Sequence, residues 1–125
     1  MTHRVLIAED EVLIAMQAED TLLEHGYDVC AVVGTASDAL ARARQMRPDV
    51  CIMDIRLRDG NSLSTAATIL GELAIPVVLA SGNVGPSSAA ATGTTHWLAK
   101  PYTPANLLAA VRRAVAARAS AAPTA

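Results

Sequence analysis

Residues 50–60 read VCIMDIRLRDG, in which four apolar residues lead directly to a carboxylate, Asp54. A short apolar run of this kind predicts a buried strand over 49–53. An ionised carboxylate in an apolar setting takes up a proton or binds a cation, because burying an isolated charge is costly. The partners of Asp54 must therefore be supplied by other parts of the chain.

The composition indicates a single compact domain. The chain has 125 residues, of which 52% are hydrophobic, and this is enough to bury a core without disulfides. The formal net charge is −2, and the arginines form no basic face of the kind that binds nucleic acid. The first apolar run is too short for a signal sequence or a membrane span. We expect a cytoplasmic protein with one domain over 1–120 and a frayed tail over 121–125. We expect this protein to bind neither nucleic acid nor membranes.

Short β-branched runs alternate with longer amphipathic segments. The runs predict five strands, at 4–8, 27–34, 49–53, 76–80 and 95–99. The longer segments predict helices over 11–26, 36–49, 62–73 and 103–119. Strands that alternate with helices indicate a parallel sheet with both faces covered. The predicted fold class is therefore α/β, and ligands are expected beyond the carboxyl ends of the strands.

The stretch 81–95, SGNVGPSSAAATGTT, interrupts this pattern. A helix is expected between the fourth and fifth strands, but this stretch contains three glycines and a proline and has no large apolar residue after Val84. A helix with this sequence would bury little surface and would gain little from packing. We therefore expect the fourth helix to be short, irregular or disordered.

Polar side chains end four of the five predicted strands. Glu9 and Asp10 follow the first strand, Asp54 the third, Ser81 the fourth and Lys100 the fifth. Since ligand sites in such sheets form at the carboxyl ends of the strands, these groups are expected to converge. One lysine cannot neutralise three carboxylates, whereas Mg²⁺ binds carboxylates together with water and phosphate oxygens. The sequence thus predicts a magnesium site that keeps Asp54 ionised.

An ionised aspartate beside Mg²⁺ and a lysine is a candidate nucleophile toward a phosphoryl group. The metal and Lys100 would stabilise charge on the transferring oxygens, and Ser81 could donate a hydrogen bond to one of them. Taken singly, these residues have simpler explanations: Asp10 could cap the next helix, Lys100 could extend along the surface, and Ser81 could be a turn residue. Five suitable groups at the ends of four strands favour the phosphoryl site.

These residues resemble the motifs of the receiver domain of two-component response regulators, and the resemblance covers nearly the whole chain. The matching positions are the acidic pair, the phosphoacceptor within DIRLRDG, the hydroxyl residue, and the lysine with its following proline, here Glu9, Asp10, Asp54, Ser81, Lys100 and Pro101. The resemblance implies a flavodoxin-like, doubly wound sheet with strand order 2-1-3-4-5. It also implies a cis peptide bond between Lys100 and Pro101.

The resemblance implies a metal-binding role for four residues. Mg²⁺ or Mn²⁺ would be held by Asp10, Asp54 and the backbone carbonyl of Arg56, with Glu9 acting mostly through water. These ligands are all oxygen atoms, which is the donor type that both ions prefer.

The resemblance also implies a conformational switch. Phosphorylation would draw Ser81 inward, and an aromatic residue three positions before the lysine, here Trp97, would follow it. Arg56 and Asn83 occupy positions that influence how long the phosphate survives. The interval from Ser81 to Lys100 is shorter than in most of the family, and it contains the poorly helical stretch.

The implied function is that of a single-domain response regulator. It would accept a phosphoryl group on Asp54 from a sensor histidine kinase or a histidine phosphotransfer protein, and it would not be an enzyme acting on other substrates. It could then dock onto a downstream protein or drain phosphate from a competing regulator. Two alternatives are a degenerate receiver that only binds a partner and a phosphohydrolase with an aspartate nucleophile. The phosphohydrolase is disfavoured, because dehalogenase-type phosphatases place a second aspartate where Arg56 stands.

Overall fold

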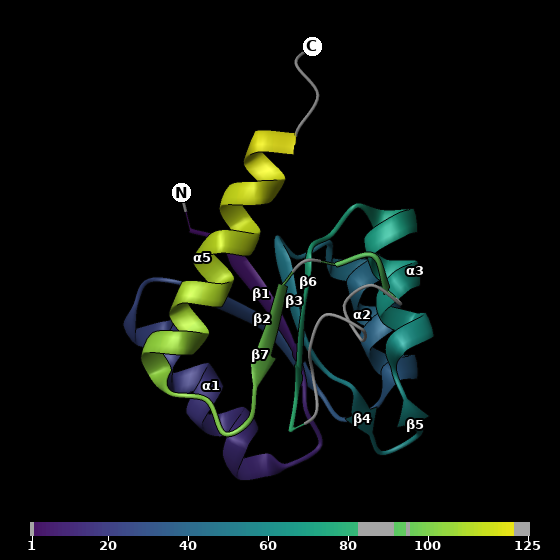
Figure 1. Ribbon diagram of the computed structural model, residues 1–125, viewed down its shortest axis with the longest axis horizontal. Coiled ribbons are helices and arrows are strands. Elements are labelled where there is room, and N and C mark those ends of the chain that lie inside the picture. Colours follow the sequence, from purple (N-terminus) through teal and green to yellow (C-terminus); the bar gives the residue numbers. More distant parts are fainter. Residues whose placement is uncertain (1, 83–91, 95, 122–125) are drawn as a thin grey trace.

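A computed structural model describes residues 2–82, 92–94 and 96–121, with side chains as far as Arg118. Five strands form one parallel sheet: β1 (Arg4–Ala8), β2 (Asp28–Val33), β3 (Val50–Asp54), β6 (Val77–Ser81) and β7 (His96–Ala99). Their order in the sheet is β2-β1-β3-β6-β7 (Figure 1). Since β6 and β7 are the fourth and fifth strands of this sheet, the predicted flavodoxin-like order is confirmed.

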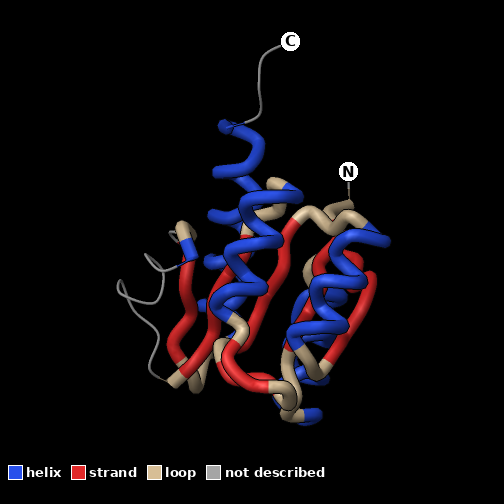
Figure 2. The backbone as a smooth tube through the Cα atoms, turned by 90° about the vertical axis from the view of Figure 1, so that its right-hand side faces the viewer, coloured by secondary structure: helices blue, strands red, loops and turns tan. Residues whose placement is uncertain are grey.

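The described helices cover both faces of the sheet. The helices α1 (Val12–Glu24) and α5 (Pro104–Ala121) pack on one face, and α2 (Ala36–Met46) and α3 (Leu63–Leu73) pack on the other. Figure 2, seen from the side of α2 and α3, shows these two helices in front of the strands. Central strands of a parallel sheet covered on both faces are apolar throughout, and this explains why the sequence around Asp54 is an unbroken apolar run.

The core divides along the alternation of side chains in the strands. In β1, Val5 and Ile7 belong to the cluster with α1 and α5, whereas Leu6 and Ala8 belong to the cluster with α2 and α3. This alternation follows from the two-residue period of an extended strand. Both clusters are continuous from β1 through β3 to β6, so the edge of the sheet that carries the candidate site rests on a packed core.

Local signals in the sequence set the helix ends. The Thr35 hydroxyl accepts a hydrogen bond from the N–H of Asp38 (3.0 Å) at the start of α2, and the Thr103 hydroxyl accepts one from the N–H of Asn106 (3.1 Å) at the start of α5. Both are N-caps. Helix α1 ends just before Gly26, whose φ of 85° is readily adopted by glycine.

A short hairpin between β3 and α3 was not predicted. Strand β4 (Arg56–Leu57) pairs antiparallel with β5 (Gly60–Asn61). Two-residue strands are too short to produce an alternating apolar pattern, so periodicity cannot reveal them. The hairpin begins two residues after Asp54 and therefore borders the candidate site.

The apolar pattern that predicted α1 does not mark the buried face of this helix. Leu22 is fully buried, whereas Val12, Leu13, Met16 and Leu23 are each more than half exposed. The buried stripe consists of Leu22 and two alanines, which allows a close approach to the sheet. Several large apolar side chains of α1 are consequently left on the surface.

Some predictions fall on segments that are not described. The expected fourth helix lies mainly within 83–91, and the expected tail lies within 122–125 except for Ala121, which ends α5. Asn83 is also outside the described residues. Among the helices that the structure does describe, none combines the length and the apolar character needed to span a membrane.

Candidate functional site at the carboxyl edge of the sheet

The predicted polar residues lie at one edge of the sheet. Glu9 and Asp10 follow β1, Asp54 and Ser81 are the last residues of β3 and β6, and Lys100 follows β7. Backbone hydrogen bonds extend the sheet past the strand ends, from the N–H of Glu9 to β2 (2.8 Å) and from the N–H of Lys100 to the carbonyl of Ser81 (3.0 Å). The strand ends therefore converge as the sequence predicted.

Three side chains form an acidic cluster, Glu9, Asp10 and Asp54. One carboxylate oxygen from each lies within 4.8 Å of the others. The side chains of Glu9 and Asp54 are only 6% and 9% exposed, while Asp10 is half-buried. Burial raises the pKa of the Glu9 carboxyl, and hydrogen bonds from Lys100 and from a backbone N–H only partly oppose this effect.

Lys100 supplies the counter-charge within this cluster. Its Nζ donates a hydrogen bond to Oδ2 of Asp54 at 2.8 Å and another to Oε1 of Glu9. Burial by itself lowers the pKa of the Lys100 ammonium, but the two hydrogen bonds and the two carboxylate charges outweigh it, so the pKa is raised. The lysine is thus held protonated beside Asp54.

The acidic cluster could hold a divalent cation. Lys100 pairs with Glu9 and Asp54, whereas the Asp10 carboxylate forms no hydrogen bond or ion pair with any residue that the structure describes. Three carboxylates and one ammonium leave excess negative charge at an edge that is largely shielded from water. Such a set of oxygen donors suits Mg²⁺ or Mn²⁺.

Ser62 was missed by sequence reasoning, although it holds the backbone at Asp54. Its side chain is fully buried, and its Oγ donates a hydrogen bond to the Asp54 carbonyl at 2.6 Å. The N–H of Ser62 bonds the carbonyl of Ile55 (2.8 Å), and the N–H of Arg56 donates to Oδ1 of Asp54 (3.3 Å). These bonds place Arg56 beside Asp54, and the role of its carbonyl as a metal ligand stays a prediction.

The remaining predictions concern Pro101, Trp97 and the lifetime of a phosphoryl group. The peptide bond between Lys100 and Pro101 is cis, as predicted. Trp97 lies in β7 and is 39% exposed. Its joint movement with Ser81 stays a prediction, as does the influence of Arg56 on the lifetime of a phosphoryl group.

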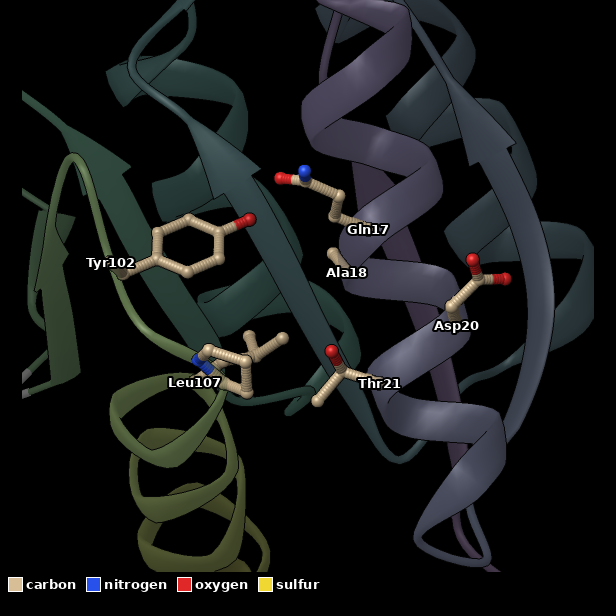
Figure 3. Close-up of a pocket in the computed structure, with 7 residues that line it drawn as sticks. Gln17, Ala18, Asp20, Thr21, Tyr102 and Leu107 are labelled. Carbon is tan, nitrogen blue, oxygen red and sulfur yellow. The ribbon is translucent and has the colours of Figure 1, made fainter.

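Tyr102, which was also missed, follows Pro101 and faces α1 across a pocket. Its ring packs against the core on the face of α1 and α5. Burial, together with the nearby charge of Glu9, raises the pKa of its hydroxyl. Tyr102 lines a pocket of about 350 Å³ between α1 and the start of α5, and Figure 3 shows its hydroxyl directed toward α1, which contributes Gln17 and Thr21. None of the predicted site residues that the structure describes lines this pocket.

Comparison with known proteins identifies similar sequences. A sequence model described as response regulator receiver domain matches residues 5–112. The transcriptional regulatory protein PdtaR of Mycobacterium tuberculosis is 32% identical over 116 residues, which are 90% of this chain and 57% of PdtaR. The chain thus spans little more than half the length of this relative.

Solved structures are similar along nearly the whole chain. The chemotaxis response regulator CheY4 of Vibrio cholerae has a TM-score of 0.82 and 26% identity, and the match covers 91% of this chain and 99% of CheY4. A CheY-like receiver domain protein of Methanospirillum hungatei has a TM-score of 0.87 at 19% identity, with 98% of this chain and all of the other covered. The second likeness concerns the fold alone.

Proposed function

Because this chain belongs to the response regulator receiver domain family, we propose that it accepts a phosphoryl group on Asp54 in a reaction that depends on Mg²⁺ or Mn²⁺. The observation that supports this proposal is the buried Asp54 carboxylate, which Lys100 contacts at 2.8 Å beside two further carboxylates. Receiver domains interact with histidine kinases or histidine phosphotransfer proteins. The proposed donor is a phosphohistidine on a protein of one of these two kinds.

The proposed step is a direct transfer between two side chains. A carboxylate oxygen of Asp54 attacks phosphorus, the bond from phosphorus to the histidine nitrogen breaks, and that nitrogen takes up a proton from water. Lys100 stabilises charge on the transferring oxygens, and Ser81 is proposed to donate a hydrogen bond to one of them. A divalent cation, when bound, supplies further neutralisation of charge; the acidic cluster and the carbonyl of Arg56 would hold it.

The proposed output is a change in protein contacts. We propose that Ser81 and Trp97 move on phosphorylation, and that Arg56 and Asn83 set how long the phosphoryl group survives. The phosphorylated form either docks onto a downstream protein or serves as a phosphate sink in the cytoplasm, with no enzymatic activity on other substrates. In a reconstituted mixture, a sink lowers the phosphorylation of a rival receiver without forming a stable complex.

Intact mass spectrometry tests the proposal. The protein is incubated with Mg²⁺ and a small phosphoryl donor, with EDTA as one control and Asp54→Asn as another, while Trp97 fluorescence is followed. We expect a single phosphoryl adduct that requires Mg²⁺ and is absent from Asp54→Asn, with a change in fluorescence. If the protein binds Mg²⁺ but forms no adduct with any donor, the partner-binding alternative is favoured instead.

A further inference from the structure

The hairpin beside Asp54 is joined to the start of α2 by three hydrogen bonds, which we call the hairpin–α2 contact. The N–H of Arg58 donates to the carbonyl of Gly34 (3.1 Å). The two carboxylate oxygens of Asp59 accept hydrogen bonds from the N–H groups of Ala36 (2.8 Å) and Ser37 (3.1 Å). Arg58 and Asp59 form the turn of the hairpin, so the contact attaches the tip of the hairpin to α2.

Helix α2 does not depend on Asp59 alone for its N-cap. The Thr35 hydroxyl already accepts a hydrogen bond from the first turn of α2. Without Asp59, the N–H groups of Ala36 and Ser37 could bind water, as N–H groups do at many exposed helix starts. The contact therefore constrains the hairpin more than it constrains the helix.

The hairpin needs such an external anchor. Each of its strands, β4 and β5, has only two residues. An isolated two-stranded hairpin is at best marginally stable in water, even when it is longer. The conformation of the hairpin must then be determined by its attachments to the rest of the protein: at the tip, at the base, and through Leu57, which is buried in the cluster with α2 and α3.

The base of the hairpin is attached at the candidate site. The Ser62 hydroxyl bonds the carbonyl of Asp54 (2.6 Å), and the N–H of Arg56 bonds the Asp54 carboxylate (3.3 Å). Arg56 lies between this base and the tip at Asp59. Without the bonds at the tip, only the base and the buried side chain of Leu57 would hold Arg56, so its carbonyl could shift relative to Asp54.

We propose that Asp59 is a positioning residue for metal binding at the acidic cluster. Through the hairpin it holds the carbonyl of Arg56 and the carboxylate of Asp54 in the relative position that a divalent cation requires. This inference rests on the proposed function, in which both groups are ligands. Asp59 is exposed and is not a member of the acidic cluster.

Calorimetric titration with Mg²⁺ tests this proposal on wild type, Asp59→Ala and Asp59→Asn. We expect Asp59→Ala to weaken Mg²⁺ binding about tenfold, which is the lower end of the effects that residues orienting metal ligands commonly have. Asp59→Asn keeps an acceptor oxygen without the charge and should lose less Mg²⁺ affinity than Asp59→Ala. The weakening should persist at high salt, which screens any direct attraction between Asp59 and the cation.

Thr35→Ala is the matched control, because it removes the other cap of the same helix. We expect it to lower stability but leave the Mg²⁺ dissociation constant unchanged within about twofold. In metal-free protein, amide exchange at Ser62 should accelerate in Asp59→Ala but not in Thr35→Ala. If wild type binds Mg²⁺ and Asp59→Ala binds it as tightly, the inference is overturned and the proposed function stands. A wild type that binds no Mg²⁺ overturns both.

Discussion

Replacing Lys100 by methionine tests the charge balance of the candidate site. The change removes the ammonium but keeps a long apolar side chain, so Glu9 and Asp54, which are 6% and 9% exposed, lose their counter-charge. Removing one partner of a buried ion pair costs about 3–5 kcal/mol. Because the site lies at the edge of the sheet, we expect the lower end, about 3 kcal/mol at neutral pH without Mg²⁺, which corresponds to roughly 10 °C in Tm for a chain of this length.

Two conditions should reduce this loss. Mg²⁺ should restore part of the stability, because a cation bound at the acidic cluster replaces the missing charge. Burial raises the pKa of Glu9, and removal of Lys100 deletes one of the two hydrogen bonds that oppose the rise. The folded variant then binds more protons than the unfolded chain, so its stability is greatest at low pH and is lost as the pH rises through the raised pKa. The cost of Lys100→Met should therefore be smaller at acidic than at neutral pH.

Urea denaturation followed by circular dichroism measures these differences, with Arg44→Met as the matched control. Arg44 pairs with Glu72, and these side chains are 54% and 59% exposed, so its replacement should cost less than about 1 kcal/mol and should not depend on Mg²⁺. A loss below about 1 kcal/mol for Lys100→Met in EDTA would refute the reasoning. A larger loss that Mg²⁺ leaves unchanged would refute the role of the cluster as a cation site.

Three other predictions concern groups outside the acidic cluster. Burial raises the pKa of the Cys51 thiol to about 12. At mildly alkaline pH, maleimide should therefore label the half-buried Cys30 much faster than Cys51, as measured by mass spectrometry, and equal labelling rates would contradict this. Thr103→Ala should lower the free energy of unfolding by about 1 kcal/mol in urea, because it removes the N-cap of α5; an unchanged midpoint would count against the cap. Burial and the charge of Arg113 lower the pKa of His96. The folded state then favours neutral His96, so stability should fall as the pH drops below about 6.5, and His96→Asn should reduce that slope; an equal slope would contradict the assignment.

The positions of the main site residues could be predicted because they follow from the alternation of strands and helices. Asp54 and Ser81 end β3 and β6, and Lys100 follows β7. Once the strands are parallel, their carboxyl ends must share an edge. The pairing of Lys100 with both Asp54 and Glu9 depends on side-chain conformation, and the sequence indicated only that these groups are near one another.

The residues that were missed act through backbone geometry. Asp59 caps a helix that begins more than twenty positions earlier in the chain. Ser62 stands at the start of α3, but its hydroxyl bonds the backbone of Asp54 and does not cap the helix. Neither contact follows from the period of a helix or a strand. The exposed Val12 and Leu13 of α1 illustrate a related limit, since apolar spacing predicts a helix but not which of its apolar residues are buried.

The most direct test of the central claim is to locate the phosphoryl group after reaction with a phosphorylated kinase or phosphotransfer protein. Borohydride reduces an aspartyl phosphate to homoserine, which tandem mass spectrometry can place in the sequence. We predict one Mg²⁺-dependent homoserine, at position 54, and none when Lys100 is replaced by methionine or when EDTA is present. Modification at another residue, or an unmodified Asp54 despite transfer to the protein, would contradict the account.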